Sequence, residues 1–153
     1  MPHGASSPRF VVGYDGSPAS LAAVQEAARR AGAAGRLIIV HAYEPPSEAL
    51  GWPLYDAAVE DAAADAQALV DNLRGHNALA GTNWVSEAVA GPTAEVIDAA
   101  ARNHDAEAIY IGSRGAGRAR ALLGSVAHEV LHRADRPVTV ITEAAAAHLQ
   151  AGC

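Results

Sequence analysis

Residues 109–125 read Ile-Tyr-Ile-Gly-Ser-Arg-Gly-Ala-Gly-Arg-Ala-Arg-Ala-Leu-Leu-Gly-Ser. An apolar strand is expected to end at Gly112, and the pair Gly124-Ser125 is expected to open a helix. Glycines let backbone N–H groups approach a ligand closely, and a helix N-terminus adds oriented donors with partial positive charge. The loop between them adds three full charges, on Arg114, Arg118 and Arg120. This stretch therefore predicts a phosphate-binding loop in an α/β protein.

Four more apolar runs accompany this strand and predict the rest of a sheet. Together with residues 108–111, they lie at residues 10–12, 37–40, 84–90 and 137–141. Helical patterns separate the runs, at residues 18–31, 56–73, 93–100 and 125–134. This alternation predicts an α/β fold with a doubly wound parallel sheet. The first, second and fourth strands are the most apolar and are expected at the centre. With right-handed crossovers, this gives a five-stranded sheet in the order 3-2-1-4-5 with helices on both faces.

The length of 153 residues suits a single domain with its own core. We assign residues 9–142 to this domain, residues 1–8 to a flexible leader and residues 143–153 to an alanine-rich C-terminal tail. The proline-rich segment 43–55 is long for a loop, which is typical of a lid or mobile flap.

The expected strand order brings two candidate sequences to one crevice. The winding of the sheet reverses between the first and fourth strands, and ligands of open α/β sheets bind outside the carboxyl ends of the strands at such a point. Asp15 follows the first strand and Gly112 ends the fourth. We therefore expect both residues at one binding site, although Asp15 alone also suits an ordinary turn.

Charge and composition exclude several function classes. A formal net charge of −6 argues against general nucleic-acid binding. The chain has no lysine, which excludes a P-loop lysine and a Schiff-base lysine. No apolar stretch approaches the ~20 residues of a membrane span. The single cysteine, Cys153, cannot form an internal disulfide. We predict a cytoplasmic protein that binds neither nucleic acid nor membrane.

Motifs along nearly the whole chain resemble those of the universal stress protein family. They are Val12-Gly13-Tyr14-Asp15-Gly16-Ser17, Val40-His41-Ala42, Gly91-Pro92, Ile111-Gly112-Ser113-Arg114-Gly115, Gly124-Ser125-Val126 and Arg136-Pro137-Val138-Thr139-Val140. The resemblance covers residues 8–142 and is specific because the motifs occur together. The ATP-binding branch of the family carries Gly-x2-Gly-x9-Gly-Ser/Thr. Gly112 and Gly115 match it, but eight residues rather than nine separate Gly115 from Gly124.

The resemblance implies that the protein binds ATP, with Mg²⁺ as a companion of the triphosphate. It implies that Asp15 lies beside adenine and ribose and that the backbone of Ala42 meets adenine. The residues implied at the ribose and phosphates are Gly112, Arg114 and Gly115, with backbone donors from Gly124, Ser125 and Val126. It further implies a stress-response sensor or switch with at most slow ATP hydrolysis, and a homodimer formed through the last strand, Val138 to Ile141.

Two alternatives remain open from the sequence. The shortened loop also suits an interaction scaffold of the same fold that binds no nucleotide. His128-Glu129-Val130-Leu131-His132 matches the His-Glu-x-x-His pattern of zinc hydrolases. On a helical wheel, however, Val126, Ala127, Val130, Leu131 and Ala134 form the expected buried face, and both histidines point nearly opposite to it. Ser17 and Ser125 each follow a glycine, but neither has an obvious His-Asp pair in a Ser-His-Asp arrangement, so we expect both to be helix caps. We predict neither a catalytic residue nor a metal site.

Overall fold

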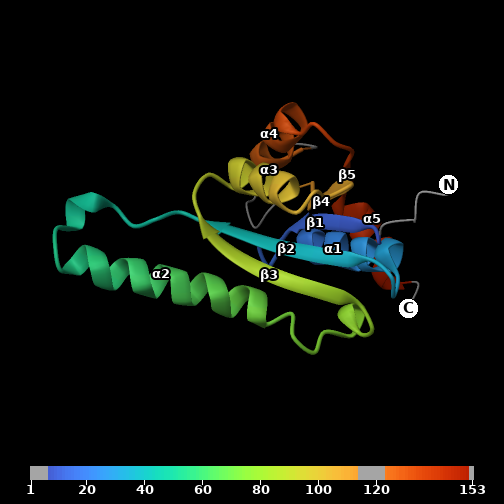
Figure 1. Ribbon diagram of the computed structural model, residues 1–153, viewed down its shortest axis with the longest axis horizontal. Helices are drawn as coiled ribbons and strands as arrows, with labels where there is room; N and C mark the ends of the chain where they lie inside the picture. Colours follow the sequence, from blue (N-terminus) through green and yellow to red (C-terminus); the bar gives the residue numbers. More distant parts are fainter. Residues whose placement is uncertain (1–6, 114–122, 152–153) are drawn as a thin grey trace.

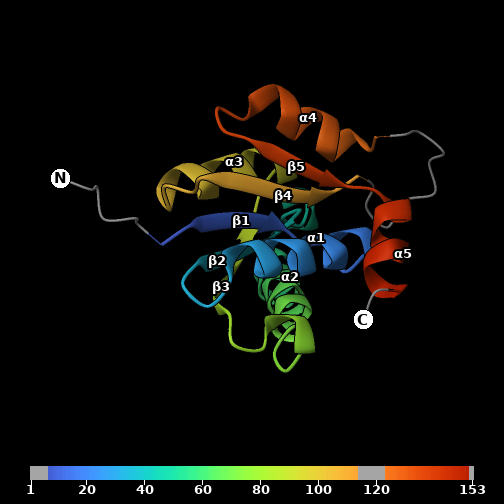
Figure 2. The same ribbon diagram turned by 90° about the vertical axis from the view of Figure 1, so that its right-hand side faces the viewer.

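Five parallel strands form a single sheet in the computed structural model, which describes residues 7–113 and 123–151 (Figure 1). They are β1 (Arg9–Gly13), β2 (Arg36–Tyr43), β3 (Asn83–Ala90), β4 (Ala108–Gly112) and β5 (Val138–Ile141). Their order is β3-β2-β1-β4-β5, which Figure 2 shows from bottom to top. The predicted fold class and strand order are confirmed. The winding therefore reverses between β1 and β4, whose carboxyl ends lie side by side.

The helices connect the strands and cover both faces of the sheet. They are α1 (Pro18–Ala31), α2 (Leu54–Asp71), α3 (Thr93–Asn103), α4 (Ser125–Arg133) and α5 (Glu143–Ala151), with short 3₁₀ turns η1 (Glu48–Leu50) and η2 (Asn77–Leu79). Helix α1 begins as the sequence predicts. The Ser17 side chain accepts a hydrogen bond from the backbone N–H of Ser20, and proline occupies the first helical position.

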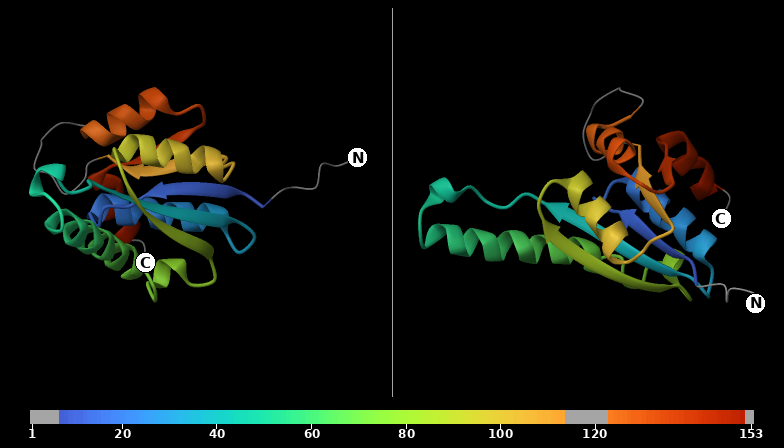
Figure 3. Two further views of the ribbon diagram at one scale, coloured as in Figure 1. Left: turned by 60° about the vertical axis from the view of Figure 1, so that its left-hand side comes forward. Right: turned by 45° about the horizontal axis from the view of Figure 1, so that its top comes forward.

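Successive side chains of the central strand β1 pack into two separate hydrophobic cores, one on each face of the sheet. Val12 packs with Ile39 and Tyr110 beneath α1 and α5, whereas Val11 packs with Ile38 and Ile109 beneath α3 and α4. Figure 3 shows α3 and α4 side by side on their face of the sheet. Because parallel strands between two helix layers are buried on both faces, they read as continuous apolar runs in the sequence.

The structure corrects several details of the helices. Residues 143–151, for which we expected no regular element, form α5, and α2 begins at Leu54 rather than at Asp56. Ser125 and Thr93 are the first residues of their helices, whereas the extended backbone of the preceding Gly124 and Pro92 makes those residues the N-caps. The capping role expected for Ser125 is therefore wrong.

The expected buried face of α4 is also only partly correct. Ala127 and Val130 are buried, but Val126 and Leu131 are 38% and 46% exposed. A helix of nine residues that packs mainly along α3 buries a narrow stripe, so apolar residues beside that stripe stay at the surface.

Glu26 is a buried carboxylate on α1 that two arginines of the same helix hold. Arg29 Nη2 lies 2.7 Å and Arg30 Nε lies 2.8 Å from Glu26 Oε1. The hydrogen bond from Arg29 is the largest cause that lowers the pKa of Glu26, and Arg30 adds to the shift against the opposing effect of burial.

We expect Glu26→Gln to lower the free energy of unfolding at neutral pH by about 1 kcal/mol, since the two arginines are largely exposed. Because folding lowers the pKa of Glu26, its stabilisation is present above the ordinary pKa of a glutamate and is lost as the pH falls through the lower pKa of the folded state. Urea denaturation at neutral and strongly acidic pH measures this difference.

The exposed Glu107 has no ion pair among the described residues, so Glu107→Gln is the matched control and should not change stability. The wild type and Glu26→Gln should converge in acid. A difference between them that stays constant with pH would contradict the assigned role of the charge.

Candidate functional site

A pocket of about 300 Å³ opens at the carboxyl ends of β1, β2 and β4. Its wall is completed by the first turns of α1, α3 and α4, through Ser20, Thr93 and residues 124–127. The volume falls at the lower end of the range for small-molecule sites. The pocket thus lies at the reversal point of the sheet, where the predicted strand order placed the candidate crevice.

The turn from β1 into α1 is held by a short chain of hydrogen bonds. Asp15 Oδ1 accepts from the backbone N–H of Ser17 at 2.9 Å, and the backbone N–H of Asp15 donates to Ser20 Oγ at 3.3 Å. The Ser20 hydroxyl in turn donates to the Ser17 carbonyl at 3.0 Å. This turn fixes the Asp15 backbone while the residue stays exposed at the pocket, so the second carboxylate oxygen is accessible to a ligand.

His41 and Tyr14 join the ends of β2 and β1 at the pocket wall. The Tyr14 carbonyl accepts a hydrogen bond from His41 Nδ1 at 2.9 Å, and the backbone N–H of Tyr14 donates to the Val40 carbonyl at the same distance. With the proton on Nδ1, a neutral His41 keeps Nε2 as an acceptor. Burial raises the pKa of the Tyr14 phenol, and the adjacent Asp15 charge adds to the rise. Tyr14 is therefore a neutral donor at physiological pH.

Gly112 lets α1 approach the end of β4 very closely. A Cβ at this position would lie 2.9 Å from the carbonyl carbon of Ala19 and equally close to the backbone nitrogen of Ser20. Gly13 differs, since a Cβ there would meet the flexible end of the Ile97 side chain at 2.7 Å. The glycine at position 112 is thus required by helix packing as well as suited to a ligand.

Within residues 7–113 and 123–151, no side chain caps the N-terminus of α4, and its first turn lines the pocket. The first N–H groups of a helix have no partner within the helix, and Gly124 supplies no side chain to cap them. Gly124 itself is fixed by a hydrogen bond from its N–H to the Ser113 carbonyl at 2.6 Å, and the Ser113 N–H donates to the Ile141 carbonyl. Uncapped donors and the positive end of the helix dipole make this a place that favours an anion.

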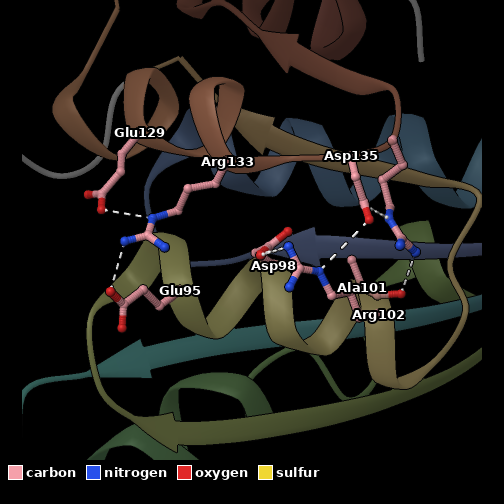
Figure 4. A network of polar contacts seen from close by, with 8 residues as sticks. Glu95, Asp98, Ala101, Arg102, Glu129, Arg133 and Asp135 are labelled. Carbon is pink, nitrogen blue, oxygen red and sulfur yellow. Dashed lines mark hydrogen bonds and ion pairs between the residues drawn. The ribbon is translucent and has the colours of Figure 1, made fainter.

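Ion pairs join α3 to α4 and to the segment that follows α4 (Figure 4). Arg133 of α4 lies 2.8 Å from Glu95 of α3. Arg102 of α3 lies 2.9 Å from Asp98 and 3.9 Å from Asp135, which follows α4. Together with the apolar contacts beneath them, these pairs hold α4 so that its N-terminus faces the pocket.

The structure brings most of the predicted site residues together. Six of them line the pocket: Asp15, Ala42, Gly112, Gly124, Ser125 and Val126. Arg114 and Gly115 lie outside the described residues. Five polar residues of the pocket wall were not predicted as site residues: Tyr14, Ser20, His41, Thr93 and Ser113. A signal for them existed, because each stands at the carboxyl end of a predicted strand or in the first turn of a predicted helix.

The histidine pair on α4 lies away from this pocket. The rings of His128 and His132 are edge to face, with centroids 4.5 Å apart, and both residues are exposed. Within residues 7–113 and 123–151, no three His, Cys, Asp or Glu side chains are grouped so that they could hold a metal ion. In the same part of the chain, no helix is long and apolar enough to cross a membrane.

Comparison with known proteins gives one consistent result. The sequence model of the universal stress protein family matches residues 7–142. A curated relative, the universal stress protein in the QAH/OAS sulfhydrylase 3′ region of Thermus aquaticus, is 34% identical over 141 residues, which cover 86% of this chain and 96% of the relative.

Solved structures share the fold. Universal stress protein UspA from Lactobacillus plantarum superposes with a TM-score of 0.74 at 24% identity, covering 90% of this chain and 99% of the other. A universal stress protein solved in complex with cAMP has a TM-score of 0.59 at 30% identity, covering 88% of this chain and 95% of the other.

Proposed function

The chain belongs to the universal stress protein family, and we propose that it binds an adenine nucleotide, ATP with Mg²⁺, in the pocket between β1 and β4. The observation that carries the proposal is the meeting of Asp15, Ala42 and the uncapped N-terminus of α4 in one cavity. The relative solved with cAMP supports an adenine nucleotide as the class of ligand.

Each part of the pocket suits one part of the nucleotide. The backbone of Ala42 and the side of the pocket formed by β2 receive adenine, and the Asp15 carboxylate accepts hydrogen bonds from the ribose hydroxyls. The backbone donors of Ser125 and Val126, together with the Ser125 hydroxyl, bind phosphate oxygens. Gly112 leaves room for the ribose and phosphates beside β4.

The glycine- and arginine-rich loop after β4 is proposed to complete the nucleotide site. Arg114 and Gly115 are proposed to contact the ribose and phosphates, across a loop that has eight residues between Gly115 and Gly124. Mg²⁺ would be held by the phosphates and would neutralise part of their charge. The described residues offer no cluster of metal ligands of their own, so the ion is expected to arrive with the nucleotide.

We propose a sensor or switch in a stress response rather than a fast enzyme. In this arrangement Asp15 binds the ribose and His41 of β2 lies on the adenine side of the pocket, so neither is placed at the phosphates as a general base and any ATP hydrolysis is expected to be slow. Nucleotide occupancy would instead change the dimer state or the binding of partner proteins. A cytoplasmic location is part of the proposal, and cell fractionation tests it.

Mass spectrometry of the small molecules released from denatured protein tests the proposal first. Isothermal titration with ATP, ADP, AMP and cAMP, each with and without Mg²⁺, then measures which nucleotide binds. The proposal predicts binding of at least one adenine nucleotide with micromolar affinity, weakened in Ser125→Ala. If none binds, the interaction scaffold without nucleotide becomes the better explanation of the shortened loop.

The outer edge of β5 is the surface through which we propose that two copies form a homodimer. The Pro137 carbonyl accepts a hydrogen bond from Ile109 of β4, and the Ile141 carbonyl accepts one from Ser113, which follows β4. Because the backbone groups of a strand point alternately to its two edges, those of Val138 and Val140 point away from the sheet. Within the described structure no strand pairs with this edge.

We expect Val140→Pro to raise the dimer dissociation constant about tenfold or more. The substitution removes an outward N–H on each copy of a two-fold interface, and each lost hydrogen bond costs about 1 kcal/mol. Analytical ultracentrifugation measures the change. Val140→Ala is the matched control, because it removes the side chain and keeps the N–H. If Val140→Ala dissociates the dimer as far as Val140→Pro does, pairing through the backbone is not what holds it.

A further inference from the structure

Large apolar side chains are exposed on a part of the molecule that projects beyond the sheet. This arm comprises residues 44–65: the segment after β2, η1 and the N-terminal part of α2 (Figures 1 and 3). Three of its residues lie close together in the sequence and are largely exposed: Leu50 at 47%, Trp52 at 76% and Leu54 at 66%. Trp52 is the most exposed large apolar side chain in the described structure.

The core formed by the described residues does not use this apolar surface. Helix α2 packs against β2 and β3, and its buried residues are Ala66 and Val70, both after the arm. Residues 54–65 of the helix contain no buried side chain. Apolar residues gathered on an element that does not contribute to the core are typical of a surface that binds a partner.

The arm also carries the net charge of the protein. Its six charged residues are all acidic: Glu44, Glu48, Asp56, Glu60, Asp61 and Asp65. The whole chain has 17 acidic and 11 basic residues, so the chain outside the arm has 11 of each sign. The formal net charge of −6 therefore lies entirely on these 22 residues, which contain no lysine, arginine or histidine.

None of these six carboxylates has an ion pair with a described residue. The described arginines, apart from Arg36, pair instead with acidic residues outside the arm: Asp105, Glu26, Asp71, Asp98, Asp135, Glu95 and Glu129. The negative charge of the arm is thus uncompensated within the described part of the molecule, beside an apolar surface that is also unpartnered.

We propose that the arm is a docking site for a basic, amphipathic segment of a partner protein. The apolar side chains of the partner would cover Leu50, Trp52 and Leu54, and its lysines or arginines would face the carboxylates of α2. A cation can also stack on the exposed Trp52 indole. The same charge opposes an anionic membrane or a nucleic acid, each of which would be repelled by the arm.

The arm and the rest of α2 approach the pocket at two points. It leaves β2 directly after Tyr43, so it starts next to the pocket residue Ala42. Further along α2, Leu69 reaches the turn that carries Asp15: a Cβ on Gly16 would lie 3.1 Å from Leu69 Cδ1. A segment docked on the arm would therefore lie near the carboxyl ends of the strands, where the pocket opens.

A defined peptide tests the proposal on the full-length protein without nucleotide. The probe is a fluorescein-labelled helical peptide of about 18 residues with leucine on one face and lysine on the other. Two control peptides replace every lysine with glutamate or scramble the order so that no apolar face remains. Fluorescence anisotropy should show micromolar binding of the basic amphipathic peptide, much weaker binding of both controls, and affinity that falls with salt.

Three variants assign the binding to the arm. Trp52→Ala should lower the affinity for the basic peptide about tenfold or more, as expected for an aromatic anchor. The triple variant Glu60→Gln/Asp61→Asn/Asp65→Asn should weaken it and reduce its dependence on salt. Leu131→Ala is the matched control, because Leu131 on α4 is 46% exposed and lies outside the arm, and it should leave the affinity unchanged.

Several results would overturn the proposal. Equal binding of the basic and acidic peptides would show that charge does not select the partner. An unchanged affinity of Trp52→Ala for the basic peptide would show that the peptide does not bind at the arm. Trp52-dependent binding to vesicles of phosphatidylserine and phosphatidylcholine would show a membrane surface instead. Self-association of the protein that Trp52→Ala abolishes would show that a second copy covers the arm. Circular dichroism confirms that the variants, all altered at exposed positions, remain folded.

Discussion

The Gly124→Asp variant is expected to bind ATP about a hundredfold more weakly than the wild type while its folded state is at least as stable. Gly124 is the N-cap of α4 and lines the pocket in which the phosphates are proposed to lie. An aspartate there would place a negative charge at the donors that the phosphates need, and like charges a few ångströms apart oppose each other by several kcal/mol in a partly desolvated site.

The same substitution is expected to stabilise α4. Aspartate is among the best N-cap residues, and its charge interacts favourably with the helix dipole, so α4 should gain about 0.5–1 kcal/mol. The backbone at Gly124 is extended, with φ −71° and ψ 163°, which aspartate adopts without strain. Loss of binding could therefore not be attributed to loss of folding. Isothermal titration and thermal denaturation measure the two effects.

Gly124→Asn is the matched control for charge. Asparagine has the size of aspartate and caps helices equally well, but it is neutral. We expect it to reduce ATP affinity by only a few fold, through competition of its side chain for the same N–H groups. If Gly124→Asn and Gly124→Asp lower the affinity for ATP equally, steric exclusion rather than charge explains the loss. If neither changes the affinity, the phosphates do not lie at α4.

The sheet could be predicted from the sequence because its signals are local and strong. The run 37–40 is apolar at every position, as expected for a strand covered on both faces, and all four of its residues are buried. The weaker runs that became β3 and β5 were correctly assigned to the edges. Once this order is known, the neighbourhood of Asp15 and Gly112 follows from topology alone, without any atomic detail.

Helix α5 could not be predicted in the same way. Residues 143–151 consist largely of alanine, so the sequence shows little contrast between an apolar and a polar face. Only the contact with α1, where Ala146 is buried in the core, reveals which face is inside. The sequence contains the propensity for a helix but not the surface that stabilises it.

The site was predictable to the level of elements but not of hydrogen bonds. Asp15 and Ala42 stand at strand ends, and that placement needs only the strand boundaries. The contact of His41 Nδ1 with the Tyr14 carbonyl depends on the offset between two neighbouring strands and on a side-chain rotamer. Neither is encoded in a pattern of apolar residues, so the sequence places His41 at a strand end but does not predict its hydrogen bond.

Gly112→Ala is expected to lower the free energy of unfolding by about 2–3 kcal/mol, even though it adds a single methyl group. That methyl would lie 2.9 Å from the backbone of Ala19 and Ser20, in the first turn of α1. Backbone cannot move aside as a side chain can, so α1 must shift along its whole length against the core that it shares with β1 and β4. Chemical denaturation monitored by circular dichroism measures the loss.

Gly13→Ala is the matched control, because Gly13 also ends a strand and also lines the pocket. Its added methyl would meet the end of the flexible Ile97 side chain, which can adopt another rotamer, so we expect a loss of about 1 kcal/mol or less. Equal destabilisation by the two substitutions would contradict a specific backbone contact at Gly112. A larger effect of Gly112→Ala would mean that the glycine which opens the proposed phosphate loop is required first for α1 to pack on β4. Loss of nucleotide binding in a Gly112 variant would then be interpretable only at a temperature where that variant is folded.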